Sequence, residues 1–147
     1  MRILMGVDDS QFAGESLKAV LSERRPEESE VMVLHVLQPV GPTPPQMAAG
    51  YVPELEAEKD SAEALVEGMA KQLRGAGFKA QSRVVVGDIR EELLDSAAEW
   101  KADLIMVGSR GTGGIQRLLL GSVPEFVARH AKCSVEIVRG SQNGHHA

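Results

Sequence analysis

The chain has 147 residues, of which 43% are hydrophobic and 25% are charged, and 16 basic against 21 acidic residues give a net charge of -5. A chain of this length buries about 70% of the surface that its unfolded form exposes, so it can form a single domain with its own core. No apolar run exceeds four residues, which excludes a helix of the ~20 apolar residues needed to span a membrane. Five aromatic residues and a net negative charge argue against nucleic acid as a partner.

Targeting and redox features predict a cytoplasmic protein. The apolar segment at residues 3–7 is shorter than the roughly 7–15 residues of a signal peptide. The single cysteine, Cys133, cannot form an internal disulfide and fits a reducing compartment, where we expect it to be structural. His145 and His146 lie in a polar tail, and we interpret them as incidental rather than as metal ligands.

The first half of the chain alternates short apolar runs with longer amphipathic stretches, a pattern typical of a parallel sheet covered by helices. Residues 3–7 predict a buried first strand and residues 31–37 a second one. Residues 38–53 hold five prolines and predict a long surface loop. The helix between the two strands ends near Pro26, and its apolar positions are Leu17, Val20 and Leu21.

The second half continues the alternation. A helix is predicted over residues 54–73, with two glycines beyond it as the stop and its acidic residues as a solvent-exposed face rather than an interaction patch. Alternating residues over 78–86 predict a third strand, and Asp88 with Glu91 predicts a capping box that begins a third helix. The remaining elements are a strand over 104–107, a helix over about 122–130 and a strand over 135–138.

This order predicts a doubly wound α/β fold with a five-stranded parallel sheet, because crossovers between parallel strands are right-handed. In such a fold, ligands bind beyond the carboxyl ends of the strands, where the winding direction reverses.

One glycine-rich segment predicts a phosphate site. It follows the strand over 104–107, has the spacing Gly-x2-Gly-x9-Gly-[Ser/Thr], and opens the helix over about 122–130. Residues 104–124 hold two arginines and no acid, which favours an anion. Glycines let backbone N–H groups approach a phosphate, and the start of the next helix attracts negative charge. The residues that define the spacing are Gly108, Gly111, Gly121 and Ser122.

This segment also allows other interpretations. The glycines could merely turn the chain, and Ser122 with Glu125 could form only a capping box. The sequence contains no Gly-Lys-[Ser/Thr], so a P-loop is excluded, and no Gly-x-Gly-x-x-Gly follows the first strand. It also lacks a Gly-x-Ser-x-Gly nucleophile elbow.

At these residues the sequence resembles the universal stress protein family, in the ATP-binding branch that carries this complete motif. The resemblance covers residues 1–139 as one nucleotide-binding domain and leaves a polar tail over 140–147. It implies a Rossmann-like fold of the adenine nucleotide alpha hydrolase-like type. Other segments that match the family are 7–10, 34–36, 123–127 and 135–138.

The resemblance also implies a set of site residues. The loop and helix start would hold the phosphates, Asp8 would lie by the ribose, the phosphates or their metal, and Val36 would meet the adenine. Asp8 could instead be a turn or cap acid, and Val36 could be ordinary strand packing. The residues expected at the phosphates are Gly108, Arg110, Gly111, Gly121, Ser122 and Val123.

The chain departs from the family pattern at two positions. Asp9 stands where a small residue is common, and it could help to hold Mg²⁺, weaken phosphate binding or simply face solvent. Pro124 replaces a common small polar residue, which the first turn of a helix tolerates. His35 and His130 are interpreted as packing or capping residues, since no motif supplies an acid and a nucleophile around them.

The resemblance implies a regulatory module of the stress response that binds ATP with Mg²⁺ or Mn²⁺ and changes its conformation or its contacts with an unknown protein partner. AMP and cAMP remain open as ligands. One alternative is a slow ATPase or phosphotransferase, although no base is evident. Another is an interaction protein that works without nucleotide. Relatives commonly pair through their final strand, which implies a homodimer here.

Overall fold

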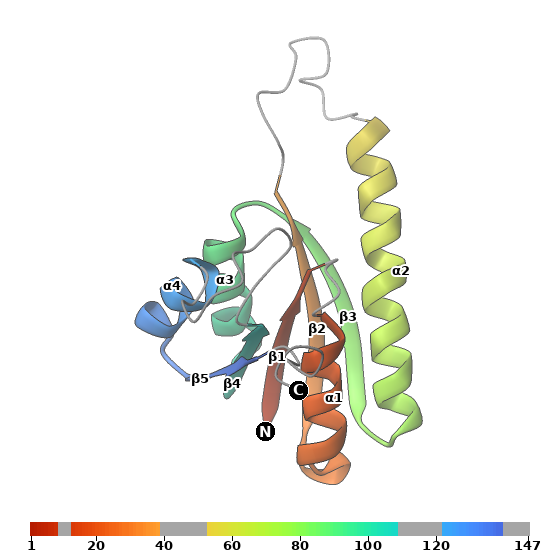
Figure 1. Ribbon diagram of the computed structural model, residues 1–147, viewed down its shortest axis with the longest axis vertical. Coiled ribbons are helices and arrows are strands. Elements are labelled where there is room, and N and C mark those ends of the chain that lie inside the picture. Colours follow the sequence, from red (N-terminus) through yellow and green to blue (C-terminus); the bar gives the residue numbers. More distant parts are fainter. Residues whose placement is uncertain (9–12, 39–52, 109–121, 140–147) are drawn as a thin grey trace, which may run out of the picture.

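The computed structural model describes residues 1–8, 13–38, 53–108 and 122–139 (Figure 1). Five strands and four α-helices alternate along these residues, with one short 3₁₀ turn. In chain order they are β1 (Arg2–Val7), α1 (Ala13–Glu23), η1 (Pro26–Glu28), β2 (Glu30–Leu37), α2 (Pro53–Gly75), β3 (Lys79–Val86), α3 (Ile89–Trp100), β4 (Leu104–Gly108), α4 (Ser122–His130) and β5 (Ser134–Val138).

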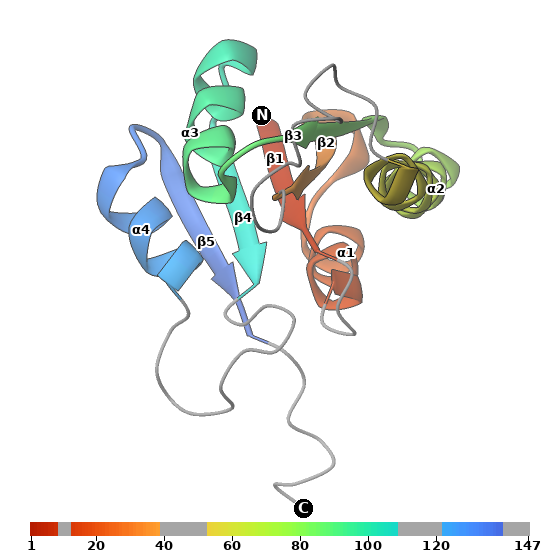
Figure 2. The ribbon, with the colours of Figure 1, turned by 90° about the horizontal axis from the view of Figure 1, so that it is seen from above.

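The strands form one parallel sheet in the order β3-β2-β1-β4-β5. Helices α1 and α2 cover one face, and α3 and α4 cover the other (Figure 2). The chain therefore winds outward from β1 to β3, returns to the centre, and winds the other way through β4 and β5. This confirms the doubly wound α/β fold, with its reversal between β1 and β4.

Strand β1 lies between two apolar layers, one on each face of the sheet. Ile3, Leu4 and Met5 have no exposed surface. Ile3 and Met5 pack toward α1 and α2, whereas Leu4 packs toward α3 and α4, because side chains alternate across a strand. This continuous apolar run, rather than an alternating one, is what a strand buried on both faces requires.

The predicted strands and helices are confirmed, with two corrections. One additional element is η1, which no sequence pattern predicts and in which Pro26 takes the first position of a 3₁₀ turn. Helical spacing predicts Leu21 on the buried stripe of α1, but Leu21 is 38% exposed, because Leu17 and Val20 already fill the contact with the sheet. The proline-rich stretch over 39–52 and the tail over 140–147 lie outside the described residues.

Asp88 begins α3 as the sequence predicted. Its carboxylate accepts hydrogen bonds from the amides of Arg90 at 3.0 Å and Glu91 at 3.2 Å. The backbone amide of Glu91 is the main cause that holds the pKa of this carboxyl below its ordinary value. Gln38, just past β2, adds a third bond by accepting from the amide of Ile89 at 2.8 Å.

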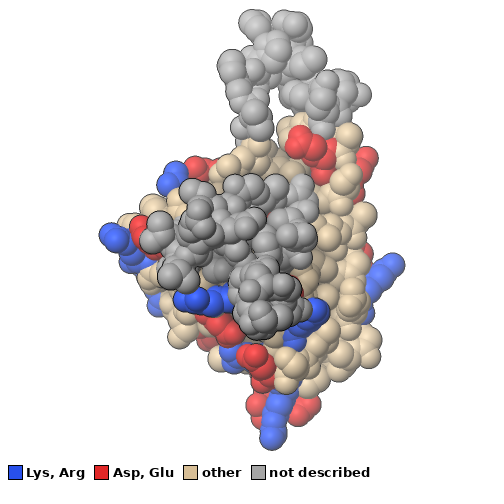
Figure 3. Space-filling view, in the orientation of Figure 1, with Lys and Arg blue, Asp and Glu red and all other residues tan. Residues whose placement is uncertain are grey.

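No helix among the described residues is long and apolar enough to cross a bilayer. The acidic residues of α2 are mostly exposed, as expected for its outer face, and Figure 3 shows them gathered near the first turns of the helix. Negative charge at a helix start is favourable because it meets the positive end of the helix dipole.

Glu67 is the exception on α2, because it fastens the helix to the edge strand β3. Its carboxylate accepts hydrogen bonds from Arg74 at 2.7 and 3.3 Å and from the Ser82 hydroxyl at 2.7 Å. Arg74 also donates to the carbonyl of Ala80 at 2.9 Å. The bond from Arg74, followed by that from Ser82, lowers the pKa of Glu67 from 4.5 to about 2.

We predict that Gly6→Ala destabilises the protein, since a Cβ at Gly6 would lie 2.8 Å from Cδ2 of the buried Leu93. Overpacking of this kind costs about 1–3 kcal/mol, measurable by urea unfolding. The matched control is Gly14→Ala on α1, where a Cβ meets nothing within 4 Å and a gain of about 0.5–1 kcal/mol is expected. Equal stability of the two variants would contradict the close approach of α3 to β1.

Glu67→Gln should lower the free energy of unfolding at neutral pH and make it less sensitive to acid. Because the folded pKa of Glu67 lies below its unfolded value, its contribution is complete above about pH 4.5 and is lost as the pH falls toward 2. Urea unfolding across this range should show the variant and the natural protein converging in acid. Ser82→Ala should cause part of the same loss of unfolding free energy at neutral pH. A difference in unfolding free energy that stays constant across this pH range would refute the role of ionised Glu67 in stability.

Candidate nucleotide-binding site

Three predicted site residues lie at the carboxyl ends of three adjacent strands. Val7 pairs with His35, so Asp8 and Val36 follow side by side at the ends of β1 and β2. On the other side of β1, Met5 pairs with Met106, and Gly108 is the last residue of β4. The structure thus brings Asp8, Val36 and Gly108 to one edge of the sheet, at the point where the winding reverses.

Val36 is 7% exposed and belongs to the apolar layer under α3 and α4, together with Leu34 and Leu93. Strand packing is therefore one role that the residue performs. Asp8 is half-buried and interacts with other groups of the protein. A carboxylate at this edge suits a hard cation such as Mg²⁺, which prefers oxygen ligands. Water molecules and phosphates commonly supply several of those oxygens.

The start of α4 presents backbone N–H groups to the same region of the fold. Ser122 is the first residue of the helix and is exposed, Val123 is half-buried against the apolar layer, and Pro124 is buried. The first amides of a helix have no partner within it, so they are available to an anion. The hydroxyl of Ser122 lies in the first turn, because α4 begins at this residue. The buried Pro124 lies in the same turn, where a backbone N–H would have no partner within the helix, so proline costs no hydrogen bond there.

Four residues of interest lie outside the described part of the chain: Asp9, Arg110, Gly111 and Gly121. The phosphate contacts expected of Arg110, Gly111 and Gly121, and the alternative roles of Asp9, therefore rest on the sequence.

The two described histidines act as packing and hydrogen-bonding residues. His35 is 7% exposed, and its Nδ1 lies 2.9 Å from the carbonyl oxygen of Val7. His130 bonds through Nδ1 to the carbonyl of Phe126 at 2.9 Å and stacks on that ring at 4.2 Å. Within the described ranges, no group of three or more His, Cys, Asp or Glu side chains could hold a metal ion.

Two contacts that position the site were not anticipated. Gly6 lets α3 approach β1 closely, and a glycine inside an apolar strand is the sequence feature that could have indicated it. The guanidinium of Arg90, at the start of α3, lies 5.2 Å from the ring of Phe126 and links α3 to α4 by a cation–π contact. No short-range pattern indicates that contact, since the two residues are far apart in the sequence.

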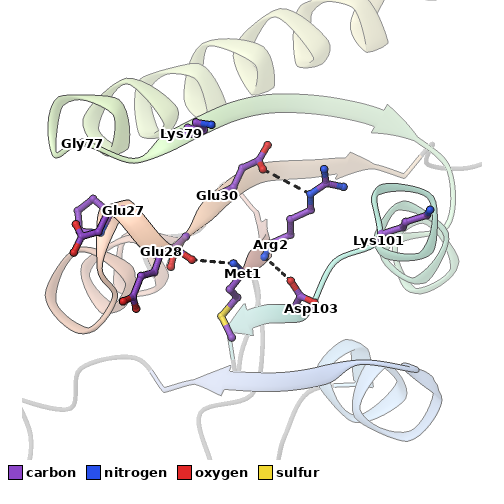
Figure 4. Close-up of a pocket in the computed structure, with 11 residues that line it drawn as sticks. Met1, Arg2, Glu27, Glu28, Glu30, Gly77, Lys79, Lys101 and Asp103 are labelled. Atoms are coloured by element: carbon purple, nitrogen blue, oxygen red, sulfur yellow. Dashed lines mark hydrogen bonds and ion pairs between the residues drawn. The ribbon is translucent and has the colours of Figure 1, made fainter.

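A hollow of about 690 Å³ lies at the opposite, amino edge of the sheet (Figure 4). Arg2 lies in its middle, with Nε 3.6 Å from Glu30 and its amide donating to Asp103 at 2.7 Å. Three basic side chains line the hollow against four acidic ones, so their charges largely cancel. Neither this balance nor the position at the amino ends of the strands fits a site for a phosphate.

Cys133 is half-buried, and burial raises the pKa of its thiol. A raised pKa reduces the thiolate fraction and with it the reactivity, which agrees with the structural role expected for this residue.

Comparison with known proteins identifies relatives along nearly the whole chain. The universal stress protein family matches residues 1–139. The universal stress protein YxiE of Bacillus subtilis is 32% identical, over 94% of this chain and 98% of YxiE. The universal stress protein MJ0577 of Methanocaldococcus jannaschii is 30% identical, and its structure matches with a TM-score of 0.77 over 96% of each chain. A universal stress protein solved in complex with cAMP is 26% identical, with a TM-score of 0.73 over 96% of this chain and 98% of that one.

Proposed function

Because the chain belongs to the universal stress protein family, we propose that it is a regulatory module that binds an adenine nucleotide, ATP with Mg²⁺ or Mn²⁺, at the carboxyl edge of its sheet. The observation that carries the proposal is the meeting of Asp8, Gly108 and the start of α4 where the winding reverses. The relative that was solved with cAMP supports an adenine nucleotide as the ligand class.

The proposed roles follow from the chemistry of each group. The backbone amides at Ser122 and Val123, with those of the loop glycines, would donate hydrogen bonds to the phosphate oxygens, and Arg110 would add a charge-assisted bond. Asp8 would hold the metal ion directly or through water, and that ion would screen the triphosphate. Val36, at the carboxyl end of β2, would contact the adenine. The complete phosphate set is Gly108, Arg110, Gly111, Gly121, Ser122 and Val123.

These contacts could together supply the affinity of a micromolar site. A dissociation constant of 1 μM needs about -8 kcal/mol. Hydrogen bonds to charged groups contribute about 1.5–3 kcal/mol each, and apolar contact with the adenine adds to them. Binding, rather than turnover, is the activity proposed, and its consequence would be a changed conformation or changed contacts with a protein partner in the cytoplasmic stress response.

Gly121→Asp should abolish the binding of Mg-ATP, because it places a carboxylate immediately before the start of α4, where the phosphates would lie. We expect the dissociation constant, measured by calorimetric titration, to rise at least about 100-fold, which corresponds to about 2.7 kcal/mol. The matched control is Gly68→Asp on the exposed side of α2, where a Cβ meets nothing within 4 Å and affinity should be unchanged. Unchanged affinity in a folded Gly121→Asp protein would exclude the site. Parallel titrations with AMP and cAMP would establish which nucleotide is preferred.

We also propose a homodimer formed through β5. Within the described residues, β5 pairs only with β4 and so carries a free edge, and its Val135 and Ile137 are half-buried. An unpaired edge strand is a template for pairing with a second chain. Light scattering should give twice the chain mass of 15.8 kDa. A mass of one chain that does not change with concentration would refute the dimer.

A further inference from the structure

An ion pair lies beside the free edge of the sheet. Arg24, the residue after α1, donates through Nη2 to Oε1 of Glu136 at 2.6 Å. Glu136 is the central residue of β5, which pairs only with β4 among the described residues and forms one edge of the sheet (Figure 2). The two side chains are 27% and 30% exposed, so both charges are partly removed from water and interact more strongly than surface charges do.

The guanidinium of Arg24 is only partly satisfied. A guanidinium carries several N–H donors and no acceptor. Besides the bond to Glu136, Arg24 makes one contact among the described residues, from Nη1 to Sδ of Met1 at 3.7 Å, and a thioether is a weak acceptor. Its Nε is buried and has no hydrogen-bond partner. A second carboxylate that reached Nη1 or Nη2 would therefore be stabilised.

A second copy of the chain can supply that carboxylate. A two-fold axis brings the same residues of two copies together. An antiparallel pair of β5 strands centred on Glu136 aligns the strand over its whole length, with Ser134 opposite Val138 of the second copy, and any other centre pairs fewer residues. The two Glu136 side chains then lie on the same face, directly opposite each other, with their Cβ atoms about 4.5–5.5 Å apart.

The two faces of this strand pair differ in chemistry. Val135 and Ile137 pack with the apolar layer under α3 and α4, and each would lie opposite the other residue of the second copy. Side chains alternate along a strand, so the face toward α1 carries the pairs of Arg24 with Glu136. Two glutamates alone would oppose this register, because like charges directly opposite destabilise a strand pair. The two arginines make the group of four charges neutral.

We propose that the β5 edge selects a second copy of this chain through a neutral cluster of two Arg24 and two Glu136 side chains, in which each guanidinium bridges the two carboxylates. The inference rests on the homodimer proposed above and adds its register and its selectivity. A strand that brought a glutamate without an arginine beside it would leave one negative charge uncompensated, so the edge discriminates against it.

Cysteine crosslinking tests the register in a Cys133→Ser background, which lacks the one natural cysteine. Glu136→Cys should form a disulfide between two copies on mild oxidation, because directly opposed Cβ atoms lie close to disulfide distance. The matched control is Ser134→Cys, exposed on the same face of β5. Its two thiols would lie four residues apart along the strands, roughly 14 Å, and should not crosslink. A dimer that crosslinks equally well at both positions, or not at position 136, would overturn the register.

A double-mutant cycle tests the charge cluster, with the dissociation constant of the dimer measured by analytical ultracentrifugation. Arg24→Gln leaves two carboxylates facing each other, so this constant should rise at least about tenfold. Adding Glu136→Gln removes the repulsion and should restore it to within about threefold of the natural protein. The matched control is Arg83→Gln, whose ion pair with Glu99 at 3.0 Å involves β3 at the other edge of the sheet. That variant should dimerise as the natural protein does.

An unchanged constant in Arg24→Gln, or no recovery in the double variant, would overturn the cluster. A dimer that fails these tests refutes the cluster alone, whereas a chain that stays monomeric at every concentration refutes the homodimer with it. Titration with Mg-ATP is independent of both, so a protein that forms this dimer but binds no nucleotide would refute only the nucleotide-binding site.

Discussion

The burial of β1 on both faces is the constraint from which the rest of the structure follows. Ile3, Leu4 and Met5 are fully buried, and β1 pairs with β2 on one side and β4 on the other. An apolar strand in this position needs helices over both faces of the sheet, so the chain must reverse its winding beside β1. That reversal puts the ends of β1 and β4 next to each other, and with them Asp8 and Gly108.

The two edges of the sheet differ chemically. At the amino edge, Arg2 and its acidic neighbours satisfy one another's charges and backbone groups. At the carboxyl edge, the start of α4 supplies amides that the helix cannot pair, on a segment of sequence without acids. The close packing of α3 on Gly6 and its contact with α4 through Arg90 hold this edge in place. These features favour an anion at the carboxyl edge over the amino edge, where the basic and acidic side chains of the described residues largely cancel.

The fold was predictable because each element carries a local pattern: the continuous apolar run of β1, the stripe of α2 and the capping residue Asp88. The position of Asp8 and Gly108 at one edge followed from the parallel topology alone. Contacts between distant residues were not predictable, because they depend on the final packing: the bond from His35 to Val7 and the ion pair of Arg24 with Glu136 at 2.6 Å. The exposure of Leu21 shows the limit of helical periodicity, which locates a stripe but not its width.

Backbone amide chemical shifts during a titration with Mg-ATP test most directly whether an adenine nucleotide binds at the carboxyl edge of the sheet. If it binds there, we expect saturable changes concentrated at Asp8, Gly108, Ser122 and Val123, with the amides of Lys79 and Lys101 at the amino edge unaffected. Saturable changes at the amino edge, or none anywhere, would contradict it.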